Sequence, residues 1–423
     1  MLASAAGTLT LGGVAASELA AAYGTPLLVI DMDVLAANIA CYERASAELH
    51  IDVAYAGKAL LVVALARRIA ASTLGLDVCS LGELLTGEAG GVPAQRMVLH
   101  GCGKSDDELR AALAGRVARI VVDHHDELRR LRALATGRPG APSLRVLLRI
   151  NTGIEARTHA FVRTGGEASK FGFPLRELDA AIAATLAIPG VTLAGIHSHL
   201  GSQIFDGEAY AASLPIALDA HERARACGAP VGELVVGGGF GVDSRPGGDR
   251  IDTPAVLRAL AHELATLCAQ RRIAAPRLGI EPGRSLVADA GTSLYRVVAT
   301  KHQGERRFAI VDGGIADNPR PALYGAYHHP TLAGRRSAAL LTEITVCGRS
   351  CENDRLVVAG LPADLATGDL VAIATTGAYT FAMASNYNRF TKPAVAFAGA
   401  GAHRLAVRRQ PWSDVLRDDV LDA

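Results

Sequence analysis

The chain has 423 residues, of which 50% are hydrophobic, so it is long enough for a large domain and a second one. Its formal net charge is +1 and it has no dense run of lysine and arginine, so we expect neither a nucleic acid nor a membrane as a partner. Seven scattered cysteines without paired spacing argue against a disulfide framework and against a zinc site. A small-molecule ligand is expected instead.

The N-terminus is rich in alanine, glycine and leucine, but no lysine or arginine precedes Arg44. A secretory signal normally begins with a basic segment, so export is not expected. No run of about 18 apolar residues occurs, so a transmembrane helix is not expected either. Together with the unpaired cysteines, these features predict a cytoplasmic protein.

From about residue 51 to residue 281, short apolar runs alternate with longer segments of helical period, which is typical of repeated βα units. Eight units in that length predict an α/β fold with a closed (β/α)8 barrel of the TIM type. The eight expected strands are Val53 to Ala56, Leu76 to Cys79, Met97 to His100, Ile120 to Asp123, Val146 to Ile150, Leu193 to His197, Leu234 to Val236 and Leu278 to Ile280.

The helices belong on the outside of this barrel, and Ser105, followed by three acidic residues, predicts the start of one of them. An earlier strand, Pro26 to Asp31, precedes the first helix near Val34 to Leu49, and we expect this strand to join the C-terminal sheet. After Glu281 the pattern changes to strands without long helices, which predicts an antiparallel β-barrel or sandwich. Its expected strands are Leu294 to Ala299, Phe308 to Val311, Leu341 to Val346, Leu356 to Val358, Leu370 to Ala374 and Leu405 to Val407. The expected domains are therefore a barrel of residues 33–285 and a β-domain of residues 1–32 plus 286–423.

Lys58 follows directly on the first expected barrel strand, with small residues on either side. At the end of a rigid strand in a crowded pocket, burial would lower the pKa of its amine and favour a nucleophilic form. A surface lysine after an edge strand is the alternative, and only the motifs further along the chain favour the first interpretation.

The loops after the seventh and eighth strands often hold phosphate in barrels of this type. Here they are rich in glycine: Gly237 to Gly241 follows the seventh strand and Glu281 to Arg284 follows the eighth. Glycines let backbone N–H groups approach a phosphate, and Arg284 adds a cation. A plain tight turn would explain the glycines alone, but their position favours a phosphate site.

The sixth strand leads into His197-Ser198-His199. Residues two apart on a strand share a face, so both histidines could point inward as metal ligands, and a barrel metallohydrolase is one interpretation. No aspartate ends the eighth strand, however. A histidine stacked on a cofactor ring, with Ser202 reaching a phosphate, uses the same residues without a metal.

Eleven motifs in order carry a resemblance that extends over nearly the whole chain. They are YAGKA (55–59), GLDVCSLGEL (75–84), HGCGKS (100–105), the run from Thr158-His159 to Thr164-Gly165, SKFGF (169–173), HSHLGSQ (197–203), GGGFG (237–241), EPGRSLV (281–287), DGGIADNPRPALYGAYH (312–328), CEND (351–354) and GAYTFAMASNYN (377–388). With these motifs the chain resembles the fold type III pyridoxal-phosphate decarboxylases, and within them the diaminopimelate decarboxylase family. The resemblance implies decarboxylation of meso-2,6-diaminopimelate to L-lysine and carbon dioxide, the last step of lysine biosynthesis.

The resemblance implies that Lys58 holds pyridoxal 5'-phosphate and that His199 stacks on its ring. Glu281 would hydrogen-bond the pyridine nitrogen and keep the ring protonated, whereas the barrel-type racemases place an arginine there. Asp77 would face the same mouth and orient Lys58, although a strand-end cap is an equally simple role. The residues implied to contact or frame the phosphate are Ser202, Gly238, Gly239, Gly283, Arg284 and Tyr379.

The second domain is implied to complete the site. Cys351 would donate the proton to the reacting carbon, and Glu352 would bind the distal ammonium of the substrate. Arg320 and Tyr324 would bind the distal carboxylate, and Arg284 and Tyr379 are further substrate-binding candidates. In the family the cysteine enters from the second subunit, so a homodimer with shared active sites is expected.

One departure from the family is the segment Cys351 to Asp354, which is one residue shorter than usual. It leaves the role of Asp354 and the reach of Glu352 open. Three alternatives therefore remain: a related decarboxylase of another basic or carrier-bound amino acid in secondary metabolism, a non-catalytic homologue, and the barrel metallohydrolase.

Overall fold

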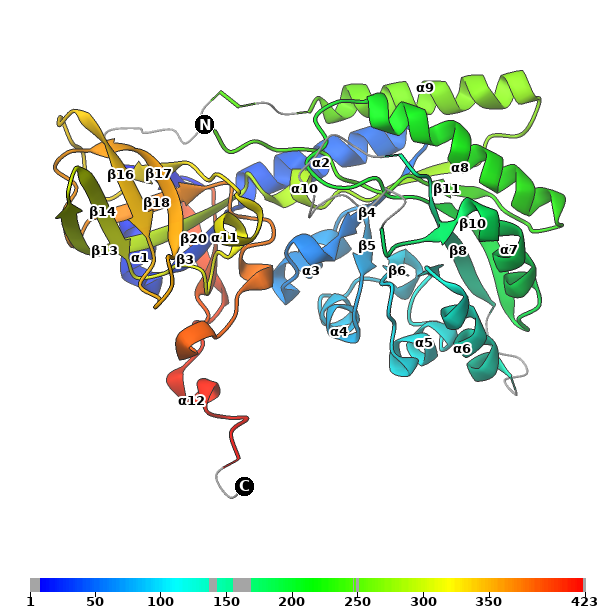
Figure 1. The fold of residues 1–423 in the computed structure, drawn as a ribbon, viewed down its shortest axis with the longest axis horizontal. Coiled ribbons are helices and arrows are strands. Elements are labelled where there is room, and N and C mark those ends of the chain that lie inside the picture. Colours follow the sequence, from blue (N-terminus) through cyan, green and yellow to red (C-terminus); the bar gives the residue numbers. More distant parts are fainter. Residues whose placement is uncertain (1–7, 137–142, 155–168, 246, 249–250, 421–423) are drawn as a thin grey trace. The chain divides into compact units, whose positions relative to one another are not determined.

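A computed structural model of the chain describes residues 8–136, 143–154, 169–245, 247–248 and 251–420. These residues form two compact units (Figure 1). The β-domain consists of residues 1–38, 242–249 and 286–423, and the barrel unit consists of residues 39–241 and 250–285. Among the described residues, no helix is both long enough and apolar enough to cross a bilayer.

Eight parallel strands close into a barrel, as the alternating pattern predicts. Each strand pairs with its neighbour, β8 pairs with β10, and β12 pairs with β4 to complete the ring. The strands are β4 (Asp52–Ala56), β5 (Gly75–Val78), β6 (Met97–Leu99), β7 (Arg119–Val122), β8 (Leu144–Asn151), β10 (Val191–His197), β11 (Glu233–Val235) and β12 (Arg277–Ile280). A two-residue strand, β9 (Phe173–Pro174), pairs in parallel with the end of β8.

The interior of the barrel is apolar, because every second residue of its strands points inward. Val98, Val121, Leu147, Ala194 and Val235 form one buried cluster there. The ring also needs a close approach between β10 and β11. A Cβ at Gly195 would lie 2.1 Å from the carbonyl oxygen of Glu233, so only glycine fits at this position.

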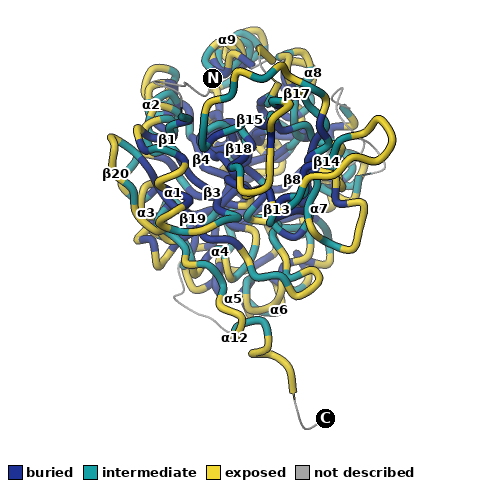
Figure 2. Tube along the Cα trace, turned by 90° about the vertical axis from the view of Figure 1, so that its left-hand side faces the viewer, coloured by how far each residue is buried: buried dark blue, intermediate teal, exposed yellow. Residues whose placement is uncertain are grey.

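Helices follow the strands on the outside of the barrel (Figure 1). They are α3 (Val63–Ala70), α4 (Leu81–Ala89), α5 (Asp106–Leu113), α6 (His125–Ala135), α7 (Leu178–Leu186), α8 (Glu208–Ala226) and α9 (Thr253–Arg271), with α2 (Met32–Leu49) before the first barrel strand and α10 (Arg284–Val287) after the last. The predicted start of α5 is confirmed, because Ser105 and Glu108 form a capping box. In Figure 2, barrel strands such as β4 and β8 are mostly dark blue, as buried, whereas the helices carry yellow, exposed residues.

The β-domain is built around β13 (Gly291–Gln303), which pairs with β14, β3 and β18. Its sheet runs β17-β16-β14-β13-β3-β19-β20, with β18 and β15 off this path. The remaining elements are β1 (Thr10–Leu11), β2 (Val14–Ala15), α1 (Ala16–Tyr23), β3 (Leu27–Asp31), β14 (Arg306–Val311), α11 (Arg320–Tyr324), β15 (Pro330–Leu332), β16 (Leu341–Cys347), β17 (Arg355–Pro362), β18 (Leu370–Ala374), β19 (Ala394–Gly399), β20 (Ala402–Val407) and α12 (Trp412–Val415).

The six strands expected in this domain are present, and β3 joins the same sheet as expected. The sheet is not purely antiparallel, however. β3 runs parallel to β19, and β14 runs parallel to β16. The first of these pairings arises because the N-terminal segment inserts between strands from the other end of the chain.

Candidate active site

Lys58 lies immediately after β4, in the short 3-10 turn η1 (Gly57–Ala59). The backbone N–H of Ala56 donates to the carbonyl of Pro282 at 3.0 Å, which ties the end of β4 to the loop after β12. The expected burial of the Lys58 amine is wrong for this structure: the turn buries Gly57 and Ala59 and leaves the lysine exposed. The lysine therefore stands at the barrel mouth, where solvent reaches it.

Glu281 lies in the loop directly after β12 and is held by two histidines. Its Oε1 lies 3.2 Å from His100 Nε2, and its Oε2 accepts a hydrogen bond from His197 Nε2 at 3.0 Å. Burial opposes ionisation of Glu281, but the charges and hydrogen bonds of the two histidines outweigh it and hold its pKa well below the usual value. The carboxylate is therefore ionised and fixed in orientation.

His100 stands at the end of β6 and connects two carboxyl groups. Its Nε2 also lies 3.6 Å from Asp77 Oδ1. Burial acts to lower the pKa of His100, but Glu281 and Asp77 together raise it to about 9. Burial lowers the pKa of His197, which remains the neutral member of the pair. Sequence reasoning missed His100 as a site residue, although it opens the quoted HGCGKS motif.

Asp77 lies near the end of β5 and is 6% exposed. Neither of its carboxylate oxygens has a hydrogen-bond partner among the described residues, so it does not cap a strand end there, and His100 Nε2 lies 3.6 Å from Oδ1. An orienting role toward Lys58 stays a prediction. Burial, followed by repulsion from Glu281, raises its pKa to about 6. A buried carboxylate without a hydrogen bond is costly and is a feature of functional sites.

His199 does not share a strand face with His197, because β10 ends at His197. Its Nδ1 instead accepts a hydrogen bond from the backbone N–H of Gly238 at 3.3 Å. Burial holds the pKa of His199 well below its usual value, and the charge of Lys58 acts in the same direction. The ring is therefore neutral and lies near both the lysine and the glycine loop.

The glycine loop after β11 leaves no room for side chains. A Cβ at Gly238 would lie 2.0 Å from the carbonyl oxygen of Glu281, and one at Gly239 would lie 2.3 Å from that of Gly201. Gly237 and Gly239 also adopt positive φ angles of 73° and 101°. Close packing, and not merely a turn, requires these glycines.

A cation and a hydroxyl lie together beside that loop. Arg284 is 7% exposed and donates from Nη2 to Ser202 Oγ at 3.0 Å. Gly283, immediately before it, is also buried. The arrangement brings together the predicted phosphate-binding residues of two separate loops.

Arg149, near the end of β8, is a buried cation that sequence reasoning missed. It lies 3.6 Å from Asp123 and its guanidinium stacks on Phe171 at 4.4 Å. Burial lowers its pKa, while Asp123 and Glu281 act to raise it. Arg149 lies within an expected barrel strand, and a charged residue in an otherwise apolar strand was the signal that could have marked it as a site residue.

The possible metal ligands in the structure differ from the expected pair, His197 and His199. Donor atoms of His100, His197 and Glu281 lie within 4.8 Å of one another, whereas His199 faces Gly238. Both histidines already bond to Glu281, which gives the cluster a role without an ion.

The predicted substrate residues lie in the β-domain. Arg320 begins α11 and is buried, with its Nη1 3.2 Å from His328 Nε2. His328 Nδ1 lies 3.2 Å from the carbonyl oxygen of Ala374. A neutral histidine that donates from Nδ1 and accepts at Nε2 satisfies both contacts. Tyr324 ends α11 and is half-buried.

The shortened segment places its four residues in different environments. Cys351 is exposed, and its backbone N–H donates to Asn388 Oδ1 at 3.2 Å. Glu352 is exposed and accepts a hydrogen bond from the Tyr387 hydroxyl at 2.5 Å.

Asp354 is buried, and its carboxylate accepts backbone N–H bonds from Ile315 at 2.6 Å and from Ser350 at 3.2 Å. It therefore anchors two loops and is not available as a substrate ligand. This answers the question that its spacing leaves open.

Tyr379 is half-buried and has a positive φ of 59°, an uncommon conformation for a bulky residue. The neighbouring Gly377 explains how the loop is held, since a Cβ there would lie 1.8 Å from the carbonyl oxygen of Val287. The motif run from Thr158-His159 to Thr164-Gly165 lies outside the described residues.

Pyridoxal phosphate suits the barrel mouth on three observations. Two backbone loops approach so closely that no Cβ fits, which leaves N–H groups and Arg284 for a phosphate. Glu281 is an ionised acceptor for a ring nitrogen. The carboxylate of Asp77 and Nδ1 of His197 are buried without hydrogen bonds, which leaves polar capacity for a ligand.

Comparison with known proteins agrees with this geometry. Residues 35–288 match the family model described as the pyridoxal-dependent decarboxylase, pyridoxal binding domain. The chain is 42% identical to the diaminopimelate decarboxylase of Actinosynnema pretiosum, over 98% of this chain and 93% of that one, and 38% identical to that of Bacillus subtilis, over 98% and 95%.

Solved structures agree as well. The diaminopimelate decarboxylase of M. jannaschii superimposes with a TM-score of 0.90 at 28% identity, over 99% of this chain and 97% of that one. The enzyme of Helicobacter pylori, in complex with L-lysine, superimposes with a TM-score of 0.87 at 28% identity, over 95% and 98%. The chain belongs to the pyridoxal-dependent decarboxylase family.

Proposed function

We propose that the protein removes one carboxyl group from meso-2,6-diaminopimelate and releases L-lysine and carbon dioxide, the last step of lysine biosynthesis. The single observation that carries this proposal is Glu281, an ionised carboxylate held by two histidines beside the strand end that presents Lys58. The relatives named diaminopimelate decarboxylase, which match nearly the full length, support the choice of substrate.

The bound cofactor supplies an aldehyde carbon and an electron-withdrawing ring that stabilises negative charge at the reacting carbon. Lys58 provides the amine that holds it, and His199 the flat neutral ring that packs on it. The phosphate is surrounded by residues of the loops at the barrel mouth, namely Ser202, Gly238, Gly239, Gly283, Arg284 and Tyr379. Asp77 lies near the ring.

Glu281 keeps a proton on the ring nitrogen, because an ionised acceptor stabilises the protonated form of its partner. The two histidines matter for this role, since they keep Glu281 ionised in spite of its burial. The buried charge of His100 offsets the two carboxyl groups that face it.

The β-domain residues select the substrate and deliver the proton. Arg320 and Tyr324 bind the distal carboxylate, Glu352 the distal ammonium, and Cys351 donates the proton to the reacting carbon. Arg284 and Tyr379, at the edge of the cofactor, also face the substrate. Replacing Arg320 by alanine should raise KM at least tenfold and leave cofactor absorbance unchanged; lost cofactor binding would contradict this role.

The protein acts as a cytoplasmic homodimer in which Cys351 and Glu352 of one subunit serve the barrel of the other. The exposure of both residues on the β-domain supports this arrangement, because each is accessible to a second chain.

Product identification tests the substrate. Purified protein with pyridoxal phosphate is incubated separately with meso-diaminopimelate, L-lysine, L-ornithine and L-arginine, and the products are identified by mass spectrometry. L-Lysine from diaminopimelate alone is the expected result. A diamine from one of the other substrates would assign the protein to the related decarboxylases instead. No product from any of them, with cofactor bound, would favour a non-catalytic homologue or a carrier-bound substrate.

A further inference from the structure

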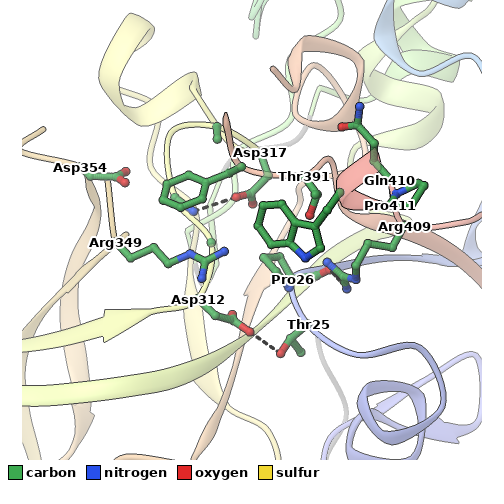
Figure 3. A pocket seen from close by; sticks show the side chains of 15 residues that line it. Thr25, Pro26, Asp312, Asp317, Arg349, Asp354, Thr391, Arg409, Gln410 and Pro411 are labelled. Carbon is green, nitrogen blue, oxygen red and sulfur yellow. Dashed lines mark hydrogen bonds between the residues drawn. The ribbon is translucent and has the colours of Figure 1, made fainter. Parts of the chain in front are cut away.

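The β-domain contains a cavity of its own, of about 330 Å³. Its wall comes from the loop after β14, from the loop before Cys351 and from the segment that leads into α12 (Figure 3). Arg320, Tyr324, Glu352 and Tyr379 do not line it. The volume suits a small organic molecule.

Two guanidinium groups extend toward this cavity from opposite sides, Arg349 and Arg409 (Figure 3). Within the described part of the chain, the Arg349 guanidinium makes no hydrogen bond or ion pair, and it lies over the Phe390 ring, 4.4 Å from its centre. Arg409 donates from Nη2 to the carbonyls of Pro26 at 2.7 Å and Tyr23 at 3.4 Å, and its other guanidinium N–H groups make no hydrogen bond to the described residues. Burial has the largest effect on Arg409 and lowers its pKa, Asp312 and Asp317 act to raise it, and the like charge of Arg349 adds a smaller lowering effect. A bound carboxylate would add to the countercharge that the two aspartates provide and would offset the repulsion between the two guanidiniums.

Three carboxyl groups also line the cavity, but each already has donors. Asp312 accepts from the Thr25 hydroxyl at 2.5 Å and from the backbone N–H of Arg296 at 2.9 Å. Asp317 accepts from Tyr295 and from the backbone N–H of Gly314 at 2.8 Å, and burial raises its pKa to about 7.

The third carboxyl group, Asp354, is held by two backbone N–H groups. Among the described residues, each of the three carboxyl groups thus has hydrogen-bond donors other than Arg349 and Arg409.

Apolar rings form part of the wall. Phe390 and Trp412 both line the cavity, and Trp412 is 65% exposed, which is unusual for a large ring. A flat apolar body would cover this ring while its anionic end reaches the guanidiniums.

We propose that this cavity is a binding site for a small carboxylate with an apolar body, its carboxylate held by Arg349 and Arg409 and its body packed on Trp412 and Phe390. The site needs no pyridoxal phosphate, so its test is independent of the decarboxylase assay.

Trp412 makes the site directly observable, because it is the only tryptophan of the chain. The cofactor-loaded protein is titrated with benzoate while tryptophan fluorescence is recorded. Benzamide serves as the uncharged ligand of the same shape, and inorganic phosphate as an anion without an apolar body. We expect a saturable fluorescence change with benzoate. Benzamide and phosphate should each bind at least about tenfold more weakly than benzoate.

Arg349→Gln localises the effect, and Arg404→Gln is its matched control. Arg404 also faces a phenylalanine ring, 5.9 Å away, but does not line the cavity. Benzoate should bind at least tenfold more weakly to Arg349→Gln and equally well to Arg404→Gln, with both variants shown to be folded by circular dichroism. No saturable change, equal binding to Arg349→Gln, or phosphate and benzamide binding as tightly as benzoate would each overturn the proposal.

Discussion

Replacing Asp77 by asparagine should stabilise the cofactor-free protein, although the residue lies in the site. The side chain is 6% exposed and has no hydrogen bond within the described residues. Burial raises its pKa from 3.8 to about 6, so the folded state prefers the neutral form. Ionised Asp77 therefore opposes folding, and neutral asparagine of nearly the same shape removes that opposition.

The magnitude follows from the two pKa values. A tenfold change in proton affinity corresponds to about 1.4 kcal/mol, and roughly two such steps separate 3.8 from 6. The cost is absent below pH 3.8, grows between the two values, and is fully present above about pH 6. The variant should gain about 3 kcal/mol in unfolding free energy at pH 8 and about half of that near pH 5.

Urea unfolding of the cofactor-free protein at the two pH values measures this gain. Asp107→Asn is the control, because that side chain is 76% exposed and should change stability by less than about 1 kcal/mol. The dependence on pH is decisive, since loss of packing would act equally at both values. A variant that is less stable than the parent at pH 8, or equally affected at pH 5 and pH 8, would refute the reasoning.

Two further predictions concern the cofactor and the subunits. Gly238→Ala places a Cβ 2.0 Å from the carbonyl oxygen of Glu281 and should abolish retention of pyridoxal phosphate on gel filtration. Gly103→Ala, whose added Cβ meets nothing within 4 Å, is the control and should retain the cofactor. Full retention of the cofactor by Gly238→Ala would contradict phosphate binding by the glycine loop. Lys58→Ala and Cys351→Ala chains should each be inactive and should regain part of the activity after subunit exchange; no recovery despite proven exchange would place the whole site within one chain.

The barrel could be predicted from the sequence because its strands are short apolar runs at regular spacing, and all eight lie where the pattern places them. The strands that were missed lack this signal. β19 is Ala-Val-Ala-Phe-Ala-Gly, and alanine and glycine have low strand propensity. β15 has only three residues and begins with Pro330. Tertiary pairing, not local preference, makes them strands.

Site residues could be predicted where a motif marks them, as at Glu281 and in the glycine loop. His100 could not, because its role arises only when closure of the barrel brings the ends of β5, β6 and β12 together. The exposure of Lys58 was missed for a related reason: position after a strand fixes the place of a side chain along the chain, but not its accessibility. Burial of Asp354 likewise depends on the loop that it anchors.

The central claim is that one particular amine holds the cofactor, and the chain has only five lysines: Lys58, Lys104, Lys170, Lys301 and Lys392. Lys104 is buried and bonded to Glu127 at 2.7 Å, which makes it the most informative internal comparison. Borohydride reduction of the cofactor-loaded protein makes the linkage between cofactor and lysine permanent, and peptide mass mapping then locates it. The account predicts the label on Lys58 alone, and a label on another lysine, or none on a protein that retains the cofactor, would contradict it.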